Sequence, residues 1–181
     1  MPTTMTHYVL GLVAAKTVRP GKTMSRFLLL SMVCSAFPDI DVLGLWAGIP
    51  YDHFLGHRGF SHSPFFALLV SVFVVAVFFW RSEVFRRKRG LLVVYFFLLT
   101  ASHGLLDAMT SGGLGVAMLS PVSNARYFLP WRPLYVAPLG RGIFSERGVQ
   151  VLGFELVWIL IPACVVWLIF WVGRNILIEE E

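Results

Sequence analysis

Long apolar stretches alternate with short polar ones along this chain. A membrane-spanning helix needs about 20 predominantly apolar residues, with a range of about 17–25. Two shorter apolar runs fit a half-span, a re-entrant segment or an interfacial helix. We therefore predict an all-α fold, a polytopic transmembrane helical bundle with three clear spans and two shorter N-terminal membrane segments. The clear spans are 64–80, 91–109 and 151–172, and the shorter segments are 5–18 and 27–37.

Local signals support these boundaries. Ser63 followed by Pro64 is typical of an N-cap with proline at the first helical position. Gly112 and Gly113 follow the second clear span and predict a helix stop. The length suggests one domain over residues 1–181, in which the Gly-, Pro- and Arg-rich stretch 110–150 forms an outer interfacial loop region.

The composition agrees with a membrane location. Hydrophobic residues make up 57% and charged residues 14% of the chain, and the mean hydropathy is +0.74. An ordinary soluble domain is about 45–50% apolar and about 25% charged, so the excess apolar surface requires lipid. The net charge of +5 is no nucleic-acid signal, because the basic residues lie between apolar runs. Cys34 and Cys164 lie inside apolar segments and form no disulfide framework.

The distribution of Lys and Arg predicts the orientation. Residues 81–89 hold five of these residues, residues 16–26 hold four, and Arg174 follows the last span. The positive-inside rule assigns these ten of the 15 to the cytoplasmic side. The other five are predicted outside: Arg58, Arg126, Arg132, Arg141 and Arg147.

With this orientation, all five histidines and several aspartates converge on the outer face. His103 and Asp107 are i and i+4 on one helix face, inside an apolar span where ionisable groups are costly and usually functional. Asp39 and Asp41 form an Asp-x-Asp turn in which both carboxylates can face one ion. The candidate metal ligands are His7, Asp39, Asp41, His57, His62, His103 and Asp107.

Imidazole and carboxylate together suit a divalent metal. We predict zinc, with manganese or iron as alternatives. Taken one at a time, each of these residues has a plainer interpretation: a His–Asp hydrogen bond between helices, an Asp turn, or an interfacial histidine. Their convergence on one membrane face favours the metal site.

Several motifs resemble the YdjM-like family. They are His7, Pro38–Asp41 (PDID), Gly56–Ser63 (GHRGFSHS), Ser102–Gly113 (SHGLLDAMTSGG) and Ser120–Pro133 (SPVSNARYFLPWRP). The family consists of inner-membrane proteins regarded as metal-dependent hydrolases. The resemblance implies a multi-pass protein of the inner membrane and the same seven ligands. Many members carry His after PDID, whereas this chain has Val42.

The predicted function is metal-dependent hydrolysis at the membrane surface, on a phosphoester or lipid-linked substrate. Asp41 or Asp39 would accept the proton of the attacking water. Arg58, with Arg126 and Arg132, would bind phosphate. The stretch 127–135 (YFLPWRPLY) is typical of an aromatic belt on the bilayer. The alternatives are a metal or small-solute transporter and a non-enzymatic membrane scaffold.

Overall fold

The computed structural model describes residues 1–18, 25–138 and 140–179. Helices dominate these ranges, which contain two isolated β-bridges and no strand, so the predicted all-α bundle is confirmed. The α-helices are α1 (Thr4–Val18), α2 (Ser25–Ala36), α3 (Val42–Trp46), α4 (Pro64–Val74), α5 (Arg89–Ala108), α6 (Glu146–Glu155) and α7 (Ile161–Glu179). Short 3₁₀ or π segments are η1 (Phe37–Asp41), η2 (Phe60–His62), η3 (Val75–Phe79), η4 (Glu83–Lys88), η5 (Gly140–Phe144) and η6 (Leu156–Leu160).

Three helical stretches are long and apolar enough to cross a membrane, which matches the predicted number: Ser25–Trp46, Glu83–Ala108 and Glu146–Asn175. Two of the predicted segments differ in class from the prediction: 27–37 is part of a candidate span, and 64–80 is not one. The short run 27–37 continues through η1 into α3, because Pro38 lies in the first turn of η1, where proline is tolerated. The predicted span 64–80 is a shorter apolar helix, Pro64–Phe79, which begins as expected with Ser63 accepting from the amide of Phe66.

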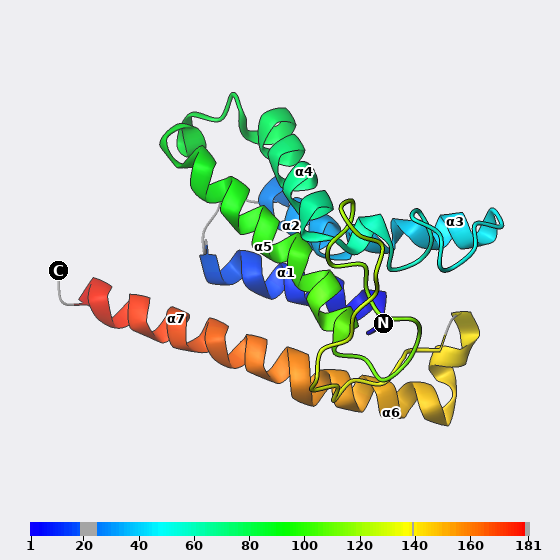
Figure 1. Cartoon of the computed structure of the whole chain (residues 1–181). Helices are drawn as coiled ribbons and strands as arrows, with labels where there is room; N and C mark the ends of the chain where they lie inside the picture. Colours follow the sequence, from blue (N-terminus) through cyan, green and yellow to red (C-terminus); the bar gives the residue numbers. More distant parts are fainter. Residues whose placement is uncertain (19–24, 139, 180–181) are drawn as a thin grey trace.

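Helices α1, α2 and α5 meet at the centre of the bundle, and α4 packs on α5 (Figure 1). Helices α1 and α2 approach closely at Gly11, where a Cβ atom would lie 2.5 Å from the carbonyl oxygen of Ser31. The final helix, α7, runs along α1 (Figure 1). It is held there in part by Arg174, which donates to the carbonyl oxygen of Thr17.

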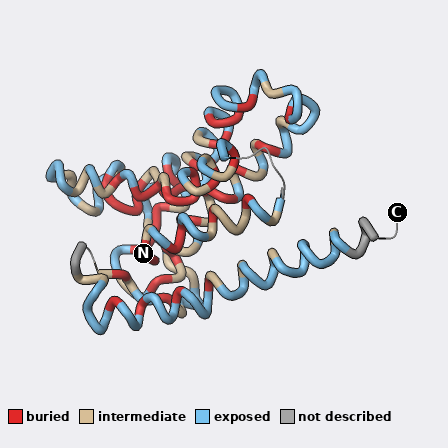
Figure 2. The backbone as a smooth tube through the Cα atoms, turned by 180° about the vertical axis from the view of Figure 1, so that it is seen from behind, coloured by how far each residue is buried: buried red, intermediate tan, exposed pale blue. Residues whose placement is uncertain are grey.

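An aromatic core fills the end of the bundle near the basic loop. Phe27 of α2 lies at its centre, with ring contacts to Phe79, Phe85, Tyr95 and Phe96 at centroid distances of 5.0–6.2 Å. Such rings contribute to stability mainly through the apolar area that they bury. At the other end of the bundle, many of the buried side chains are polar. Figure 2 shows the buried segments concentrated where the first helices and α5 meet.

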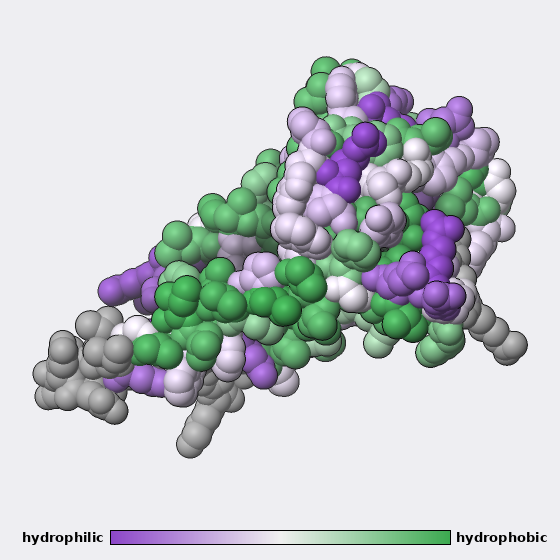
Figure 3. Space-filling model, turned by 90° about the horizontal axis from the view of Figure 1, so that it is seen from below, coloured by the Kyte–Doolittle hydropathy of each residue, from purple (hydrophilic) through white to green (hydrophobic). Residues whose placement is uncertain are grey.

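The last helix is largely exposed in the isolated chain (Figure 2). Only 6% of the most apolar window in Glu146–Asn175 is buried. Hydrophobic side chains form a broad band between groups of hydrophilic ones on the face shown in Figure 3. An apolar helix with so little protein contact requires lipid around it.

The predicted basic side of the protein corresponds to one end of the bundle. Arg26 donates to the carbonyl oxygen of Phe78 beside the loop 81–89, and Arg174 lies at the carboxyl end of α1. The histidines lie at the opposite end of α5. Arg19 and Lys22, which also entered the predicted orientation, fall outside the described residues.

A buried glutamate at the end of α6 contacts the start of α1. Glu155 is 1% exposed, and its carboxylate accepts hydrogen bonds from the amide and hydroxyl of Thr3 and from the hydroxyl of Thr6, each at 2.6 Å. The carboxylate therefore satisfies donors at the amino end of α1, where backbone amides lack partners within the helix. This contact fixes the start of α1, three residues before His7.

We expect Glu155→Leu to destabilise the protein by about 1–3 kcal/mol, because it leaves buried donors of Thr3 and Thr6 without an acceptor. Thermal unfolding in detergent, followed by tryptophan fluorescence, would show a lower Tm. The exposed Glu146 at the start of α6 provides the control, since Glu146→Leu should change stability by no more than about 0.5 kcal/mol. Equal melting temperatures for the two variants would contradict this account.

Candidate metal centre

Four separate parts of the chain deliver the seven predicted ligands to one end of the bundle. His7 comes from α1, the two aspartates of PDID from η1, two histidines from the loop that ends in η2, and the last pair from α5. All seven side chains are buried: His7, Asp39, Asp41, His57, His62, His103 and Asp107. His53, the fifth histidine, is exposed in the loop before them.

Four of these residues form a compact group. Asp39, His62, His103 and Asp107 each offer an atom that lies within 4.8 Å of the others. His103 Nε2 is 3.3 Å from Asp39 Oδ1. His62 Nε2 is 3.4 Å from Asp107 Oδ2 and 3.8 Å from Asp39 Oδ1. The spacing His103-x-x-x-Asp107 thus places both side chains toward the same point, as the helix repeat predicts.

His7 borders this group. Its Nε2 atom is 4.0 Å from Asp107 Oδ1, and its ring stacks on His103 with 3.8 Å between centroids. Neither ring nitrogen of His7 has a hydrogen-bond partner among the described residues. A small inward shift would add it to the group as a further ligand.

Asp41 belongs to a second group, with His57 and His62. Its carboxylate accepts from His57 Nδ1 at 2.7 Å, from the amide of Arg58 at 3.0 Å and from Ser61 Oγ at 2.5 Å. It also lies 3.0 Å from His62 Nδ1. Asp39 and Asp41 were expected to face one ion, but they point to different sides of His62, and Asp41 already serves several donors.

The hydrogen-bond partners define the tautomer of His103. Its Nδ1 atom lies 2.9 Å from the carbonyl oxygen of Ser35, which can only accept, so Nδ1 carries the proton. In the neutral ring, Nε2 then presents a lone pair to Asp39 Oδ1 at 3.3 Å. Two acceptors at this distance repel each other unless a cation lies between them. A backbone carbonyl that accepts from the other ring nitrogen is the usual support of a metal-bound histidine.

His62 shows the same arrangement from the loop side. Burial disfavours its charged form, but the carboxylates of Asp107 and Asp41 outweigh this effect and raise the pKa of His62 to about 9. The ring is therefore drawn to carry a positive charge between the two aspartates. A metal cation at Nε2 would supply this positive charge in place of the proton.

The donor set fits a divalent metal. Buried inward atoms without a hydrogen-bond partner in the described chain include Asp39 Oδ1, His62 Nε2, His103 Nε2 and both carboxylate oxygens of Asp107. Three buried carboxylates face the buried guanidinium of Arg58, and when a metal replaces the proton on His62, two of their negative charges are left to balance. One divalent cation would balance them, and buried charges require such compensation.

Arg58 has structural contacts that the sequence did not predict. Its side chain is 1% exposed, its Nε atom is 3.0 Å from Asp107 Oδ2, and its Nη1 atom donates to the carbonyl oxygen of Gly112. Its backbone has φ of 61°, which few residues other than glycine adopt. This conformation directs the amide to Asp41 while the side chain reaches Asp107. The predicted role of Arg58 in phosphate binding stays a prediction.

The other two arginines lie farther out. Arg126 donates to the carbonyl oxygens of His57 and Tyr51, and partial burial lowers its pKa. Arg132 is exposed, with its guanidinium 5.0 Å from the centroid of the Phe128 ring. Of the three, Arg132 is the one whose charge is most accessible to a ligand at the surface.

Several supporting residues were not identified from the sequence. Ser35 holds His103 through its carbonyl group and donates its hydroxyl to the carbonyl oxygen of His7 at 2.6 Å. Thr4 donates to Asp39 Oδ2 at 3.1 Å. Ser31 and Ser35, four residues apart in an apolar helix, were the available signal that this face contacts other helices.

Gly104 permits the close contact between α5 and the histidine loop. A Cβ atom at this position would lie 2.3 Å from the carbonyl oxygen of His62. Gly104 directly follows His103 in the sequence. Its lack of a side chain allows the backbone of His62 to come close enough for the ring to join the group.

We expect Gly104→Ala to destabilise the protein by about 1–3 kcal/mol, because the added methyl group displaces the backbone of His62. Gly90 lies on the same helix with no atom within 4 Å of an added Cβ. Gly90→Ala should therefore retain or raise stability, since alanine favours a helix over glycine by about 1 kcal/mol. Thermal unfolding of both variants checks the contrast, and a Gly104→Ala protein as stable as Gly90→Ala would refute the close contact.

The fold and the buried ligand group define a multi-pass helical membrane protein with a candidate metal centre. The chain belongs to the YdjM inner membrane protein family, whose model matches residues 1–176. It is similar to the inner membrane protein YbcI of Escherichia coli (strain K12), with 36% identity over 178 residues that cover 97% of this chain and 100% of that protein. No solved structure matches the chain. Family membership supports the predicted location in the inner membrane.

Proposed function

We propose that this protein is a membrane-bound, metal-dependent hydrolase that acts on a phosphoester or lipid-linked substrate at the membrane surface. The observation that carries the proposal is the set of buried ring-nitrogen and carboxylate atoms without a hydrogen-bond partner in the described chain that converge from α1, η1, η2 and α5. His103 Nε2 facing Asp39 Oδ1 at 3.3 Å is its clearest part. Such an arrangement is costly in a membrane protein unless a cation occupies it.

In this proposal, Asp39, His62, His103 and Asp107 hold the metal, with His7 adjacent to them. Histidine nitrogens and carboxylate oxygens in this ratio suit zinc, with manganese or iron as alternatives. A bound divalent metal would act as a Lewis acid and activate water for attack on the ester.

The other residues orient the group and the substrate. Asp41 fixes the rings of His62 and His57, so we assign it to positioning before proton transfer. Asp39 directs Oδ1 to the ligand group and Oδ2 to Thr4, so Asp39 remains the candidate proton acceptor through Oδ2. Arg132, exposed within the aromatic segment 127–135, is suited to contact a phosphate from the surface.

The side of the membrane follows from charge. The candidate metal centre lies at the end of α5 opposite the basic loop of residues 81–89. The positive-inside rule assigns this loop to the cytoplasm, so we propose that the site faces the non-cytoplasmic side.

Metal content tests the site directly. We expect the purified protein to retain about one equivalent of divalent metal, measured by elemental analysis, because the donor set balances one divalent cation. His103→Ala should lose most of it. His53→Ala is the matched control, since this exposed histidine lies outside the group and its loss should leave the metal content unchanged. Metal-free wild type after reconstitution with zinc, manganese or iron would refute the proposal.

Turnover tests the enzyme. We expect the metal-loaded protein to hydrolyse p-nitrophenyl phosphate or its diester, to lose this activity with a chelator and to regain it with metal. Asp107→Asn should reduce kcat at least about 100-fold, as is typical for metal-site residues and their supports. A metal-containing protein without turnover, but with metal-dependent flux in liposomes, would instead favour the transporter. A wild type with neither metal, turnover nor flux, whose Asp107→Asn variant loses only stability, would favour the scaffold.

A further inference from the structure

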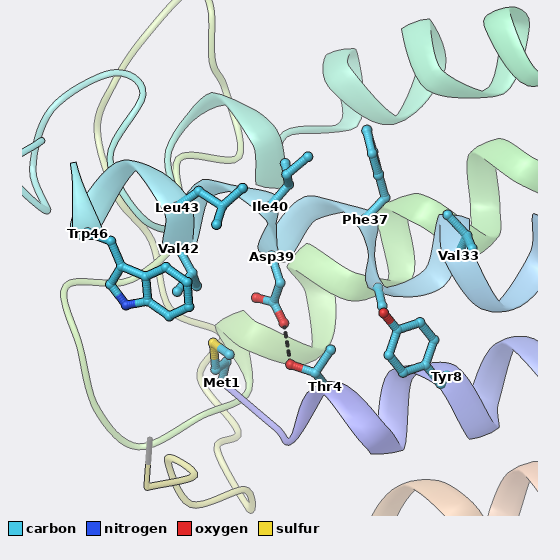
Figure 4. A pocket seen from close by; sticks show the side chains of 11 residues that line it. Met1, Thr4, Tyr8, Val33, Phe37, Asp39, Ile40, Val42, Leu43 and Trp46 are labelled. Carbon is cyan, nitrogen blue, oxygen red and sulfur yellow. Dashed lines mark hydrogen bonds between the residues drawn. The ribbon is translucent and has the colours of Figure 1, made fainter. Parts of the chain in front are cut away.

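A groove adjoins the candidate metal centre on the membrane-facing side. It has a volume of about 450 Å³ and lies between α1 and the continuous stretch α2–η1–α3. Asp39 is directed into it and accepts from Thr4, with Trp46 on one side and Tyr8 on the other (Figure 4). Asp39 thus belongs both to the groove and to the ligand group, because its Oδ2 atom contacts Thr4 while Oδ1 faces His103.

Large apolar side chains surround the opening of this groove. Trp46 is 80% exposed, Leu43 55% and Ile40 48%, and all three lie in the candidate span Ser25–Trp46. Side chains of this kind on a membrane-spanning segment contact lipid rather than water. The groove therefore opens toward the bilayer, not only toward the aqueous phase.

A second groove continues the first along α2. It lies between α2 and α4, has a volume of about 380 Å³ and is lined only by apolar residues. Val33 and Phe37 line both grooves and mark their junction. The two together form one continuous surface, with the Asp39 carboxylate in the first groove and a purely apolar wall in the second.

The part of the combined groove between Leu30 and Asp39 is about as long as one lipid leaflet is thick. Leu30, in the second groove, and Asp39, in the first, are separated by about 14 Å at the rise of α- and 3₁₀-helices. This is close to half of the hydrocarbon core, which is about 30 Å thick. A polar head group at Asp39 would leave room for its hydrocarbon chain along α2 at the depth that the chain occupies in the bilayer.

We propose that the combined groove binds a hydrocarbon chain of a phosphate-bearing lipid and presents its head group to the candidate metal centre. This inference rests on the proposed function for the fate of the head group, and it narrows the substrate class from phosphoesters in general to lipids of the leaflet that borders the site. The occupant enters sideways from the membrane. Soluble phosphoesters would reach the metal without using the groove.

The junction residue Val33 allows a selective test. Val33→Trp would fill the point that both halves share. Val94→Trp is the matched control, because Val94 is 52% exposed on α5 and does not line either half. Both variants place one tryptophan on a lipid-facing helix, and their melting temperatures show that each is folded.

The probe is phosphatidylglycerol with a photoreactive diazirine in one acyl chain, added at increasing amounts to the detergent-purified protein, with mass spectrometry of the labelled peptides. We expect saturable labelling of residues 30–46 and 69–78. Val33→Trp should raise the half-saturation concentration about tenfold, which is the loss of affinity expected when roughly two methylene groups are no longer buried. Val94→Trp should not change it. Labelling that does not saturate, spreads over α7 and is equal in all three proteins would overturn the groove.

The same experiment on chelator-treated protein separates this inference from the hydrolase. Saturable labelling of the chelator-treated protein would show that the groove binds lipid without metal, and the enzyme would be refuted separately if the wild type, after reconstitution with metal, showed neither bound metal nor turnover. Conversely, metal-dependent turnover of p-nitrophenyl phosphate without a groove-specific label would refute the lipid site alone. If both hold, Val33→Trp should raise KM for a long-chain lipid phosphate about tenfold and leave p-nitrophenyl phosphate turnover unchanged.

Discussion

The repulsion between buried acceptors determines the organisation of one half of this molecule. Asp39, Asp41 and Asp107 are enclosed at the end of an apolar bundle, and the nitrogen lone pair of His103 is directed at one of them. Burial strengthens this repulsion, and no hydrogen bond relieves it within the described chain, because Thr4 donates only to the other oxygen of Asp39. Arg58 offsets part of the negative charge through Asp107. Everything around the group, from the Ser35 carbonyl to the strained backbone of Arg58, holds these atoms in place rather than letting them separate.

The two ends of the bundle use different physics. Around Phe27, aromatic rings bury area and tolerate small shifts, since apolar contacts are not directional. Around His62, polar atoms face one another at 3.0–3.4 Å, and such contacts depend on distance and direction. At Gly11 and Gly104, backbones approach closely because no side chain lies between them. The aromatic end therefore supplies general stability, while the polar end depends on exact geometry.

Helix periodicity and charge asymmetry made the all-α bundle and the convergence of residues predictable. His103 and Asp107 share a face because four residues make about one turn, and no tertiary information is needed to see it. The sequence did not predict that Asp39 and Asp41 belong to different groups. An Asp-x-Asp spacing does not specify how the 3₁₀ turn η1 separates the two carboxylates. The same holds for Arg58, whose burial depends on a left-handed backbone conformation. Hydropathy also misjudged the segment after residue 37, since Pro38 and two aspartates interrupt the apolar run without ending the helical stretch.

The contact between Glu155 and Thr3 joins residues 152 positions apart. A membrane protein is inserted from its amino end while it is still being synthesised, and the domain is completed in that order. The acceptor for the first turn of α1 is thus among the last parts to arrive, and His7 sits one helical turn beyond that contact. The contact that fixes the amino end of α1 can therefore form only after α6 has been synthesised. A ribosome-bound chain that has not reached residue 155 already contains all seven ligand residues but lacks the carboxylate that accepts from Thr3 and Thr6 at the start of α1.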